Sequence, residues 1–582
     1  MFDKQHILDL QNKLIEDGFD AYLIVTGDPH SSEYVADYFL AERNYFCPFS
    51  GSAGYLLVLK NSAYFFTDGR YWIQAENELK GSGISLVKEG DKSALSFEDL
   101  LKKEGVQKLA TNTNLISYNF AKRVKGYGVE LVNYDYSYLV KDRGQLSKEK
   151  VFKLRDNLNS LSHLEKIEAV LKECEKDKAE ACLITTLDDI AWILNIRGND
   201  IACNPVFYSY LYLSKKGNYL FIDRDKIDFE IEGVNLLPYS QIEEFVKSHS
   251  EVATLVNPSF CSCALYSCLK NPLNGKIPST LMKSIKGEKE IENLKRVQAE
   301  DGLAMLKFIA YLDEHKDENL SEYHYAEVLE KFRRENKDLF ELSFETIAAC
   351  GSNAAQMHYE PTKEKSSIVS KETMELLVDS GGQYYGGTTD TTRTFLIGEA
   401  SQEYIHDYTL TLKSLIAMSR AIFLDGVSGI ALDVLSRQYM WDEGMDYKCG
   451  TGHGVGYILN VHEGPNSFRY VARSVENLQK LVPGMVTTIE PGVYKENKYG
   501  IRIENNLLCV RAFETSDGIF NKFETVTYVP IETSCLDLNI MTDREIDWLN
   551  QYHKLVYEKL SPLVKDEKLM RVLKEKTKSI KR

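Results

Sequence analysis

The sequence predicts two similar α/β domains followed by a larger α+β domain, and three observations support this fold class. At 582 residues the chain is too long for one hydrophobic core, and its length is typical of three or four domains. Residues 1–285 alternate amphipathic helices with short apolar strands, which is typical of α/β domains with a mostly buried sheet. Residues 286–582 begin with a long helical pattern and continue with several strand-like segments, so they form the remaining unit.

The N-terminal part contains a weak internal repeat. Residues 21–28 form a strand-like segment after an amphipathic helix, and residues 181–188 repeat this arrangement after a second helical segment. Two copies of one α/β unit would explain the pattern, with a first domain at 1–160 and a second at 161–285. The polar stretch 140–150 is the expected connection between them. Short helix–strand patterns also recur by chance, so the duplication is a hypothesis.

The third expected domain, residues 286–582, has helices at both ends. Apolar residues recur at a helical period after Gly287 and predict a long first helix. A second helix is expected at about 323–334, and the lysine-rich tail 542–582 also has a helical pattern. Strand-like segments fill most of the sequence between these helices, which predicts an α+β arrangement.

Composition excludes several classes of function. The formal net charge of −16 argues against a nucleic-acid-binding surface, which needs a basic patch. The eleven cysteines are scattered without a small-domain framework, so we expect reduced thiols in a reducing compartment. The first residues lack an apolar signal core, and no run of about eighteen apolar residues could span a bilayer. We therefore expect a cytoplasmic protein that binds neither nucleic acid nor membrane.

Four carboxylates and one histidine lie between residues 378 and 504, near the ends of apolar segments or in a glycine-rich loop. They are Asp379, Asp390, His453, Glu490 and Glu504. Any one of these acids is best explained as a turn cap or a solvated side chain, but that explanation is poor for all of them together. Buried carboxylates repel one another unless a cation compensates them. An oxygen-rich set with one imidazole suits Mn²⁺, Mg²⁺ or Fe²⁺, and five ligands with bridging carboxylates suit a two-metal centre.

The same five residues and their neighbours resemble the metal ligands of the pita-bread metallopeptidases in order and local context. Within that group the chain is similar to the cytosolic, three-domain Xaa-Pro aminopeptidases, and the resemblance runs over essentially its whole length. It implies two creatinase/prolidase N-domain-like units before a pita-bread catalytic domain. The motifs that carry it are VDSG at 378–381, TTDTTRT at 388–394, GTGHGVG at 450–456, NVHEGP at 460–465, IEPG at 489–492 and GIRIEN at 500–505.

The resemblance implies an enzyme that removes the first residue of a peptide when proline follows it. The Xaa-Pro bond is a tertiary amide that general aminopeptidases handle poorly, so it needs a dedicated pocket. Asp379, Asp390, His453, Glu490 and Glu504 would hold two divalent ions. A hydroxide bridging the ions would attack the carbonyl. Glu490 would pass the proton of the metal-bound water to the leaving proline nitrogen. Mn²⁺ is the expected ion, although the ligand types also leave Co²⁺, Zn²⁺ and Fe²⁺ open.

Other residues gain candidate roles only through the resemblance. His358 and His462 match substrate-contacting and catalytic histidines, although a lone histidine more often forms structural hydrogen bonds. Arg502 is expected to orient Asp379 from outside the ligand set. Arg70 matches an arginine that reaches the substrate cleft in relatives, although its own sequence context indicates only a turn.

Cys449 is the main departure from the family pattern. The family usually has a histidine four residues before the ligand histidine, and that histidine is expected to line the pocket near the substrate proline. A thiol can pack there but cannot donate as an imidazolium does. We therefore expect Cys449 in the substrate pocket, with either altered substrate preference or reduced activity.

Three alternatives follow from the same motifs. An Xaa-Pro dipeptidase (prolidase) uses the same ligands, but relatives of that kind usually lack the second N-terminal domain. Creatinase-like enzymes share the fold but have lost metal ligands, whereas all five are present here. A weakly active or inactive peptidase-like binding protein is the third alternative, kept open by Cys449; such proteins often end in acidic tails, whereas this chain ends in lysines. Because relatives dimerise through the catalytic domain, we also expect a homodimer.

Overall fold

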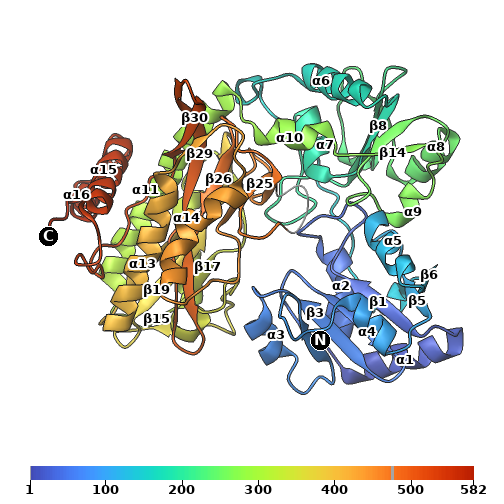
Figure 1. Ribbon diagram of the computed structural model, residues 1–582, viewed down its shortest axis with the longest axis horizontal. Coiled ribbons are helices and arrows are strands. Elements are labelled where there is room, and N and C mark those ends of the chain that lie inside the picture. The colour runs from blue at the N-terminus through green and yellow to red at the C-terminus, as the bar shows by residue number, and fades with distance from the viewer. Residues whose placement is uncertain (1, 473–477) are drawn as a thin grey trace. The chain divides into compact units, whose positions relative to one another are not determined.

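The computed structural model describes residues 2–472 and 478–582. The chain divides into two compact units, which Figure 1 shows as ribbons. The first unit comprises Met1–Leu154 and Leu161–Thr280, and the second comprises Arg155–Ser160 and Leu281–Arg582. Within the described residues, no helix is both long enough and apolar enough to cross a membrane.

The first sheet of the N-terminal unit has the strand order β4-β3-β2-β1-β5-β6. β1 pairs antiparallel with β2, β2 antiparallel with β3, and the outer strands add in parallel. Alternation along the strands divides the core into two layers: Ile24 packs with Leu14 of α1 on one face, and Leu23 packs with Leu101 of α4 on the other. The elements are α1 (Lys4–Asp17), β1 (Ala21–Val25), α2 (Asp37–Phe46), β2 (Tyr55–Leu59), β3 (Ala63–Thr67), α3 (Trp72–Glu78), β4 (Ser85–Lys88), α4 (Phe97–Lys103), β5 (Lys108–Thr111), α5 (Tyr118–Gly126) and β6 (Glu130–Asn133).

The second sheet repeats the first. Its order is β12-β11-β10-β8-β13-β14, and each pair has the same relative direction as its counterpart in the first sheet. The predicted duplication is therefore confirmed, and the expected connection at 140–150 contains neither helix nor strand. The elements are β7 (Phe152–Lys153), α6 (His163–Lys176), β8 (Ala181–Ile184), α7 (Leu187–Leu194), β9 (Ile196–Arg197), β10 (Ser209–Ser214), β11 (Tyr219–Ile222), β12 (Asn235–Pro238), α8 (Ile242–Ser248), β13 (Thr254–Val256), α9 (Cys263–Tyr266), β14 (Pro272–Asn274) and α10 (Pro278–Ser284).

The second unit is an α+β domain in which helices pack against several antiparallel sheets. The predicted first helix is α11 (Glu288–His315), and the predicted second helix is α12 (Glu322–Arg334). Its sheets have the orders β17-β19-β22, β16-β20-β21 and β23-β30-β29-β26-β24-β25. The strands are β15 (Leu320–Ser321), β16 (Leu339–Leu342), β17 (Ile347–Ala349), β18 (Ile368–Val369), β19 (Glu375–Ser380), β20 (Gly382–Tyr384), β21 (Gly387–Thr388), β22 (Thr391–Leu396), β23 (Ile422–Leu424), β24 (Gly452–Gly454), β25 (Glu463–Phe468), β26 (Val486–Ile489), β27 (Gly492–Lys495), β28 (Tyr499–Arg502), β29 (Asn505–Thr515) and β30 (Gly518–Thr525).

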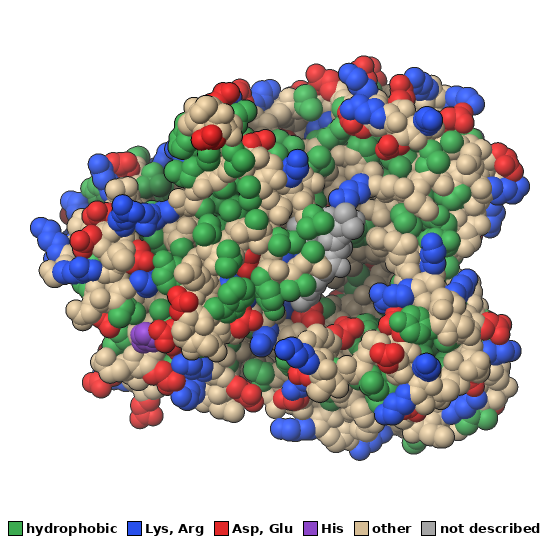
Figure 2. Space-filling view, in the orientation of Figure 1, with side chains coloured by type: hydrophobic (Ala, Val, Ile, Leu, Met, Phe, Trp, Pro, Cys, Tyr) green, Lys and Arg blue, Asp and Glu red, His purple; other side chains and the backbone are tan. Residues whose placement is uncertain are grey.

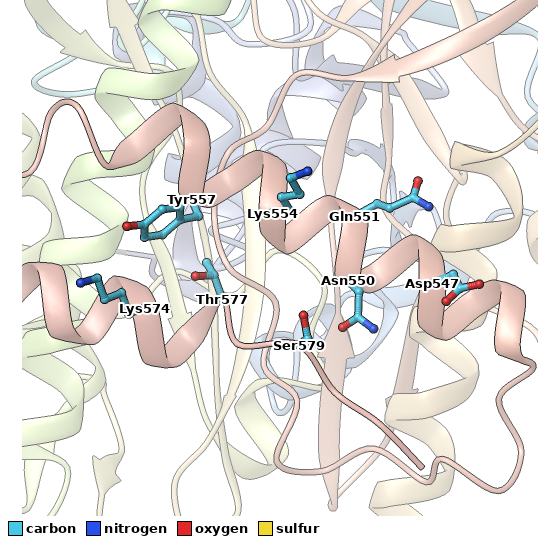
Figure 3. A pocket seen from close by; sticks show the side chains of 8 residues that line it. All are labelled: Asp547, Asn550, Gln551, Lys554, Tyr557, Lys574, Thr577 and Ser579. Carbon is cyan, nitrogen blue, oxygen red and sulfur yellow. The ribbon is translucent and has the colours of Figure 1, made fainter.

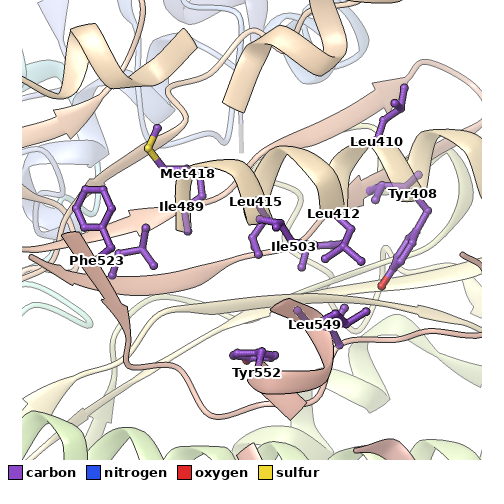
Figure 4. Close-up of a cluster of buried hydrophobic side chains, with 14 of the residues drawn as sticks. Tyr408, Leu410, Leu412, Leu415, Met418, Ile489, Ile503, Phe523, Leu549 and Tyr552 are labelled. Carbon is purple, nitrogen blue, oxygen red and sulfur yellow. The ribbon is translucent and has the colours of Figure 1, made fainter. Parts of the chain in front are cut away.

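Two hydrophobic clusters hold these sheets in place. In the first, Phe308 of α11 packs with Val378 of β19, so α11 and α12 (Glu322–Arg334) cover the sheet that carries Asp379. In the second, Leu415 of α13 (Gln402–Ser419) packs with Ile489 of β26 and with α14 (Gly429–Asp442). Figure 4 shows this second cluster, where Ile503 joins the side chains of α13. The strand ends that carry the candidate ligands are therefore anchored by buried apolar neighbours on the same segments.

The C-terminal tail is helical, as predicted, and consists of α15 (Asp543–Leu560) and α16 (Glu567–Lys576). Thr542 caps α15, and Glu545 completes a capping box. A groove of about 490 Å³ lies against these helices (Figure 3). Its lining residues are Asp547, Asn550, Gln551, Lys554, Tyr557, Lys574, Thr577 and Ser579, and none of them belongs to the predicted metal site.

Candidate metal centre

The first two candidate ligands are brought together by the pairing of β19 with β22. Asp379 lies in β19 opposite Thr392, and Asp390 immediately precedes β22. The segment between them is rich in glycine and contains the short strands β20 and β21. Glu504 joins this pair because its backbone N–H donates to the carbonyl of Thr392 at 3.1 Å. The Thr392 hydroxyl also donates to Oε2 of Glu504 at 2.9 Å, which fixes the carboxylate.

His453 was predicted in a glycine-rich loop, but it lies in the short strand β24. The flanking glycines are typical of a loop, but here close packing between strands leaves no room for a side chain at Gly452. A Cβ on Gly452 would lie 1.9 Å from the carbonyl oxygen of Thr488, so the neighbouring strand approaches too closely for any side chain. Nδ1 of His453 lies 2.9 Å from the carbonyl oxygen of Gly454, while Nε2 lies 3.4 Å from both Asp390 and Glu490.

Three of the candidate acids lie next to strands, and one lies within a strand. Asp390, Glu490 and Glu504 lie directly beside strands rather than within them, whereas Asp379 lies inside β19. The backbone N–H of Glu490 donates to the carbonyl of Thr451 at 2.8 Å, which ties it to the segment that carries His453. Ligand atoms of Asp390, His453 and Glu504 all lie within 4.8 Å of one another. The five predicted ligands therefore converge from four separate parts of the sequence.

The electrostatics of this cluster favour a bound cation. Burial raises the pKa of Glu504 well above its usual value, and the nearby charges of Asp390 and Asp379 raise it further. Burial likewise raises the pKa of Glu490. Burial alone would lower the pKa of His453, but the adjacent Asp390 and Glu490 carboxylates raise it to about 9. Among the described residues, Oδ1 of Asp379 is buried without a hydrogen-bond partner, as expected of an atom that faces a cation. The residues present therefore fit a divalent metal site.

Arg502 pairs with Asp379, as the resemblance implied. Its Nη2 lies 2.7 Å from Oδ2 of Asp379, and the arginine side chain is 4% exposed. Nη1 donates to the hydroxyl of Tyr494 at 2.8 Å, and Nε donates to that of Thr392 at 3.2 Å. These contacts hold the guanidinium in one orientation and leave Oδ1 of Asp379 directed elsewhere.

Both candidate histidines lie on segments that touch the ligand cluster. The ring centroids of His462 and His453 are 4.2 Å apart with a T-shaped arrangement. His358 follows Met357, whose carbonyl accepts a hydrogen bond from Nη2 of Arg502 at 3.3 Å. Both histidines are half-buried, so their rings remain partly accessible.

The two remaining candidates differ in their position. Cys449, four residues before His453 in the chain, is half-buried. Its carbonyl accepts a hydrogen bond from Nη2 of Arg437 at 2.6 Å. Arg70 lies in the N-terminal unit, where its guanidinium forms an ion pair with Asp68 at 2.8 Å.

Sequence reasoning missed two buried groups that support the candidate histidines. Glu322 is fully buried and accepts hydrogen bonds from the backbone of Cys350 and the hydroxyl of Tyr359, so it anchors the turn that carries His358. Lys286 forms a buried ion pair with Glu463, the residue after His462. Glu322 and Lys286 belong to no recognisable motif, whereas Glu463 lies in the NVHEGP motif at 460–465, next to His462, and this position was the signal that could have pointed to it.

Comparisons with known proteins agree with this arrangement. The model of metallopeptidase family M24 matches residues 292–511, and that of its C-terminal region matches 519–580. Two models of the creatinase/prolidase N-terminal domain match residues 7–140 and 142–290. Xaa-Pro aminopeptidase 1 of Dictyostelium discoideum is 35% identical, with 95% of this chain and 92% of the relative covered. A probable Xaa-Pro aminopeptidase P of Tuber melanosporum is 36% identical, with 93% of each chain covered.

Solved structures extend the comparison. The crystal structure of X-prolyl aminopeptidase from Caenorhabditis elegans, described as a cytosolic enzyme with a di-nuclear active site, matches with a TM-score of 0.94. It is 31% identical, with 99% of this chain and 100% of that chain covered. The prolidase from Pyrococcus horikoshii OT3, at 22% identity and a TM-score of 0.50, shares the fold and covers 63% of this chain. The chain therefore belongs to metallopeptidase family M24 and, within it, to the family of the Xaa-Pro aminopeptidases.

Proposed function

We propose that this protein is a metal-dependent aminopeptidase that hydrolyses the N-terminal Xaa-Pro bond of peptides. The observation that carries the proposal is the convergence of five candidate ligands in one buried site: Asp379, Asp390, His453, Glu490 and Glu504. Relatives that share about 35% of their residues along nearly the whole chain are named Xaa-Pro aminopeptidases. Two divalent ions held by these residues would lower the pKa of water and polarise the scissile carbonyl.

The chain's own residues would bind and orient the substrate and move its protons. Burial raises the pKa of Glu490, so its carboxylate can hold a proton between two steps of the reaction and deliver it to the leaving nitrogen. His462, against the ring of His453, would donate a hydrogen bond to the carbonyl oxygen as charge develops there. His358 would also contact the substrate. Arg502 would keep Asp379 ionised and oriented, because it supplies the compensating charge at 2.7 Å.

Cys449 and Arg70 complete the proposed substrate-binding set. Cys449 would line the pocket for the proline ring, where a small, weakly polar side chain provides packing but no charged donor. Arg70 is proposed to contact the peptide because it resembles an arginine of relatives. The second proline-specific candidate, an Xaa-Pro dipeptidase, is less well supported, because the prolidase of Pyrococcus horikoshii OT3 aligns with only 63% of this chain while 99% of that prolidase is covered.

The proposed ions are manganese, and the proposed compartment is the cytoplasm. Oxygen ligands with one imidazole favour Mn²⁺ over thiolate-binding metals, although Co²⁺, Zn²⁺ and Fe²⁺ remain testable alternatives. None of the eleven cysteines, all of which lie among the described residues, takes part in a disulfide, which suits a reducing compartment. The similar enzyme of Caenorhabditis elegans is described as cytosolic.

We also propose that two copies form a homodimer through the catalytic unit. Large apolar side chains are exposed on α14 and on the neighbouring edge strand β23, and Figure 2 shows apolar side chains gathered on this face around α14. They are Ile422, Leu424, Val434, Leu435 and Trp441. Light scattering during size-exclusion chromatography should give about twice the chain mass of 66.4 kDa, and a monomer would refute this part of the proposal.

The deciding experiment compares three peptides. The protein is stripped with a chelator, Mn²⁺ is added back, and cleavage is followed for an Xaa-Pro-Xaa tripeptide, an Xaa-Pro dipeptide and an Xaa-Ala tripeptide. Metal-dependent release of the first residue from the proline tripeptide alone is the expected result. Cleavage of the dipeptide alone would identify a dipeptidase. No turnover with any of the four metals, together with restored turnover in Cys449→His, would indicate a binding protein whose chemistry was lost at this position.

A further inference from the structure

One buried arginine connects the candidate metal ligands to the C-terminal helices. Arg393 is the third residue of β22, three residues after Asp390, and it is fully buried. Its neighbour Thr392 directs its hydroxyl to the carboxylate of Glu504, at 2.9 Å. Because side chains alternate along a strand, Arg393 points away from that contact. Arg393 nevertheless contacts the backbone of Glu504, because Nη1 donates to the carbonyl oxygen of Glu504 at 2.5 Å.

The guanidinium of Arg393 has an unusual set of partners. Nη2 donates to Oδ1 of Asn505 at 2.8 Å and to the carbonyl of Val529 at 2.8 Å, and Nε donates to the carbonyl of Pro530 at 3.0 Å. Among the described residues, no carboxylate forms an ion pair with it. An arginine buried without a counter-charge is costly, so its five donors must all be directed at fixed acceptors. The fork of Arg393 therefore holds the carbonyl of Glu504 and the side chain of Asn505, the two residues joined by the peptide bond after Glu504.

The last acceptor comes from the C-terminal region. Nη2 of Arg393 donates to the hydroxyl of Tyr552 on α15 at 2.8 Å, and this hydroxyl donates to the carbonyl of Val529 at 2.7 Å. The next residue, His553, accepts a hydrogen bond from the backbone of Ile531 at 3.2 Å. Tyr552 lies in the same hydrophobic cluster as Ile503, the residue before Glu504, as Figure 4 shows. Helix α15 thus holds the segment around Val529 against Arg393 and, through it, against the ligand.

We propose that Arg393, supported by Tyr552, is a positioning residue for Glu504, and that the C-terminal region thereby sets the metal affinity of the site. The proposal rests on the proposed role of Glu504 as a metal ligand. Glu504 would be held at three points: its N–H by the carbonyl of Thr392, its carboxylate by the hydroxyl of Thr392, and its carbonyl by Arg393. Groups that orient metal ligands typically change metal affinity by about 10–100-fold when they are removed.

The test compares Arg393→Lys with Arg333→Lys. Arg333 is also fully buried in the same unit, where Nε pairs with Asp301 at 2.7 Å, and none of its hydrogen bonds reaches a candidate ligand. Both variants keep the positive charge and lose the planar fork. Mn²⁺ is titrated into chelator-stripped protein and followed by calorimetry, with electron paramagnetic resonance of the bound manganese and thermal unfolding of the metal-free protein. We expect both variants to unfold at lower temperature, but only Arg393→Lys to bind Mn²⁺ at least tenfold more weakly and to change the manganese spectrum.

A gentler pair of variants covers the case in which Arg393→Lys does not fold. Tyr552→Phe removes only the hydroxyl that accepts from Arg393, and Tyr325→Phe removes a buried hydroxyl that donates to the carbonyl of His315 at 3.3 Å. We expect Tyr552→Phe to weaken Mn²⁺ binding severalfold and Tyr325→Phe to leave it unchanged. Equal Mn²⁺ affinities within each pair would overturn the proposal. An unmodified protein that binds no Mn²⁺ would instead refute the proposed function.

Discussion

The buried ion pair between Lys286 and Glu463 leads to the sharpest prediction about the catalytic unit. The two side chains are 2% and 1% exposed, and Lys286 precedes the first helix of the unit whereas Glu463 begins β25. Glu463 directly follows His462, whose ring lies 4.2 Å from that of His453. Lys286→Met should therefore have two effects: it should leave a buried carboxylate without its cation, and it should release the segment that carries His462.

The structure gives the size of both effects. Removing one partner of a buried pair destabilises a protein by about 3–5 kcal/mol, because the remaining charge is uncompensated. The exposed fractions of 2% and 1% mean that solvent screens this pair very little. The double variant Lys286→Met/Glu463→Gln should be less destabilised than the sum of the single variants, by about 2 kcal/mol. Since removal of an oxyanion donor lowers kcat by about 100–1,000-fold, displacement of His462 should lower it by roughly tenfold or more.

Urea unfolding and peptide kinetics of the metal-loaded protein measure these effects, with Lys413→Met as the control. Lys413 pairs with Glu545 at 3.1 Å in the same unit, and the two side chains are 10% and 4% exposed. Lys413→Met should lower the stability without a specific loss of kcat. The reasoning would be refuted by an unchanged stability of Lys286→Met, or by equal losses of kcat in the two variants.

Three further predictions concern separate parts of the catalytic unit. Burial and the charge of Arg393 lower the pKa of His553 to about 4. Because this histidine has a pKa near 6.5 in the unfolded chain, the unfolded state takes up the proton first as the pH falls. The free energy of unfolding should therefore be highest above about pH 6.5 and fall by up to about 3 kcal/mol as the pH drops towards 4. His553→Gln should flatten this part of the pH profile in urea unfolding, and an unchanged slope would contradict the assignment. Asp390→Asn should bind fewer than two ions per chain by elemental analysis and lose activity by more than about 100-fold; full metal occupancy would remove it from the ligand set. Glu322→Gln should raise KM, because the turn that carries His358 loses a charged hydrogen-bond acceptor. It should also lower the free energy of unfolding by about 1–3 kcal/mol. If neither value changes, the turn does not depend on Glu322 for its conformation.

Local patterns account for what the sequence predicted well. The repeat of strand-like residues at 21–28 and 181–188 predicted two similar units, because similar helix–strand patterns bury their apolar faces in similar ways. The five candidate ligands were recognised because each lies inside a short motif whose neighbours also match. His453 was placed in a loop because glycine disfavours strands in general. At Gly452 a strand is formed in spite of this general preference, because the carbonyl of Thr488 approaches too closely for any other residue. Thr488 lies more than thirty residues further along the chain, so no local pattern indicates this contact.

The groups that sequence reasoning missed are joined by contacts between distant parts of the chain. Arg393 and Tyr552 are 159 residues apart, and Lys286 and Glu463 are 177 residues apart. Such pairs form only when several elements pack together. Arg393 and Glu463 lie inside the motifs TTDTTRT and NVHEGP, but no local pattern indicates that Tyr552 and Lys286 are their partners. Their polar groups are buried, and a buried polar group without a partner is costly. The fold therefore determines these contacts, because each buried charge needs partners that only the folded chain brings within reach.

The backbone and the side chain of Cys449 have separate roles in the structure. The carbonyl of Cys449 is held by Arg437, which is fully buried and also pairs with Asp433 and Asp446. Thr451, two residues later, donates to Asp433 through its hydroxyl and accepts the N–H of Glu490 through its carbonyl. These contacts use backbone atoms at position 449 and do not depend on its side chain. These contacts hold the path of the chain towards His453 through atoms other than the Cys449 side chain, so we expect Cys449→His to leave the candidate metal ligands in place.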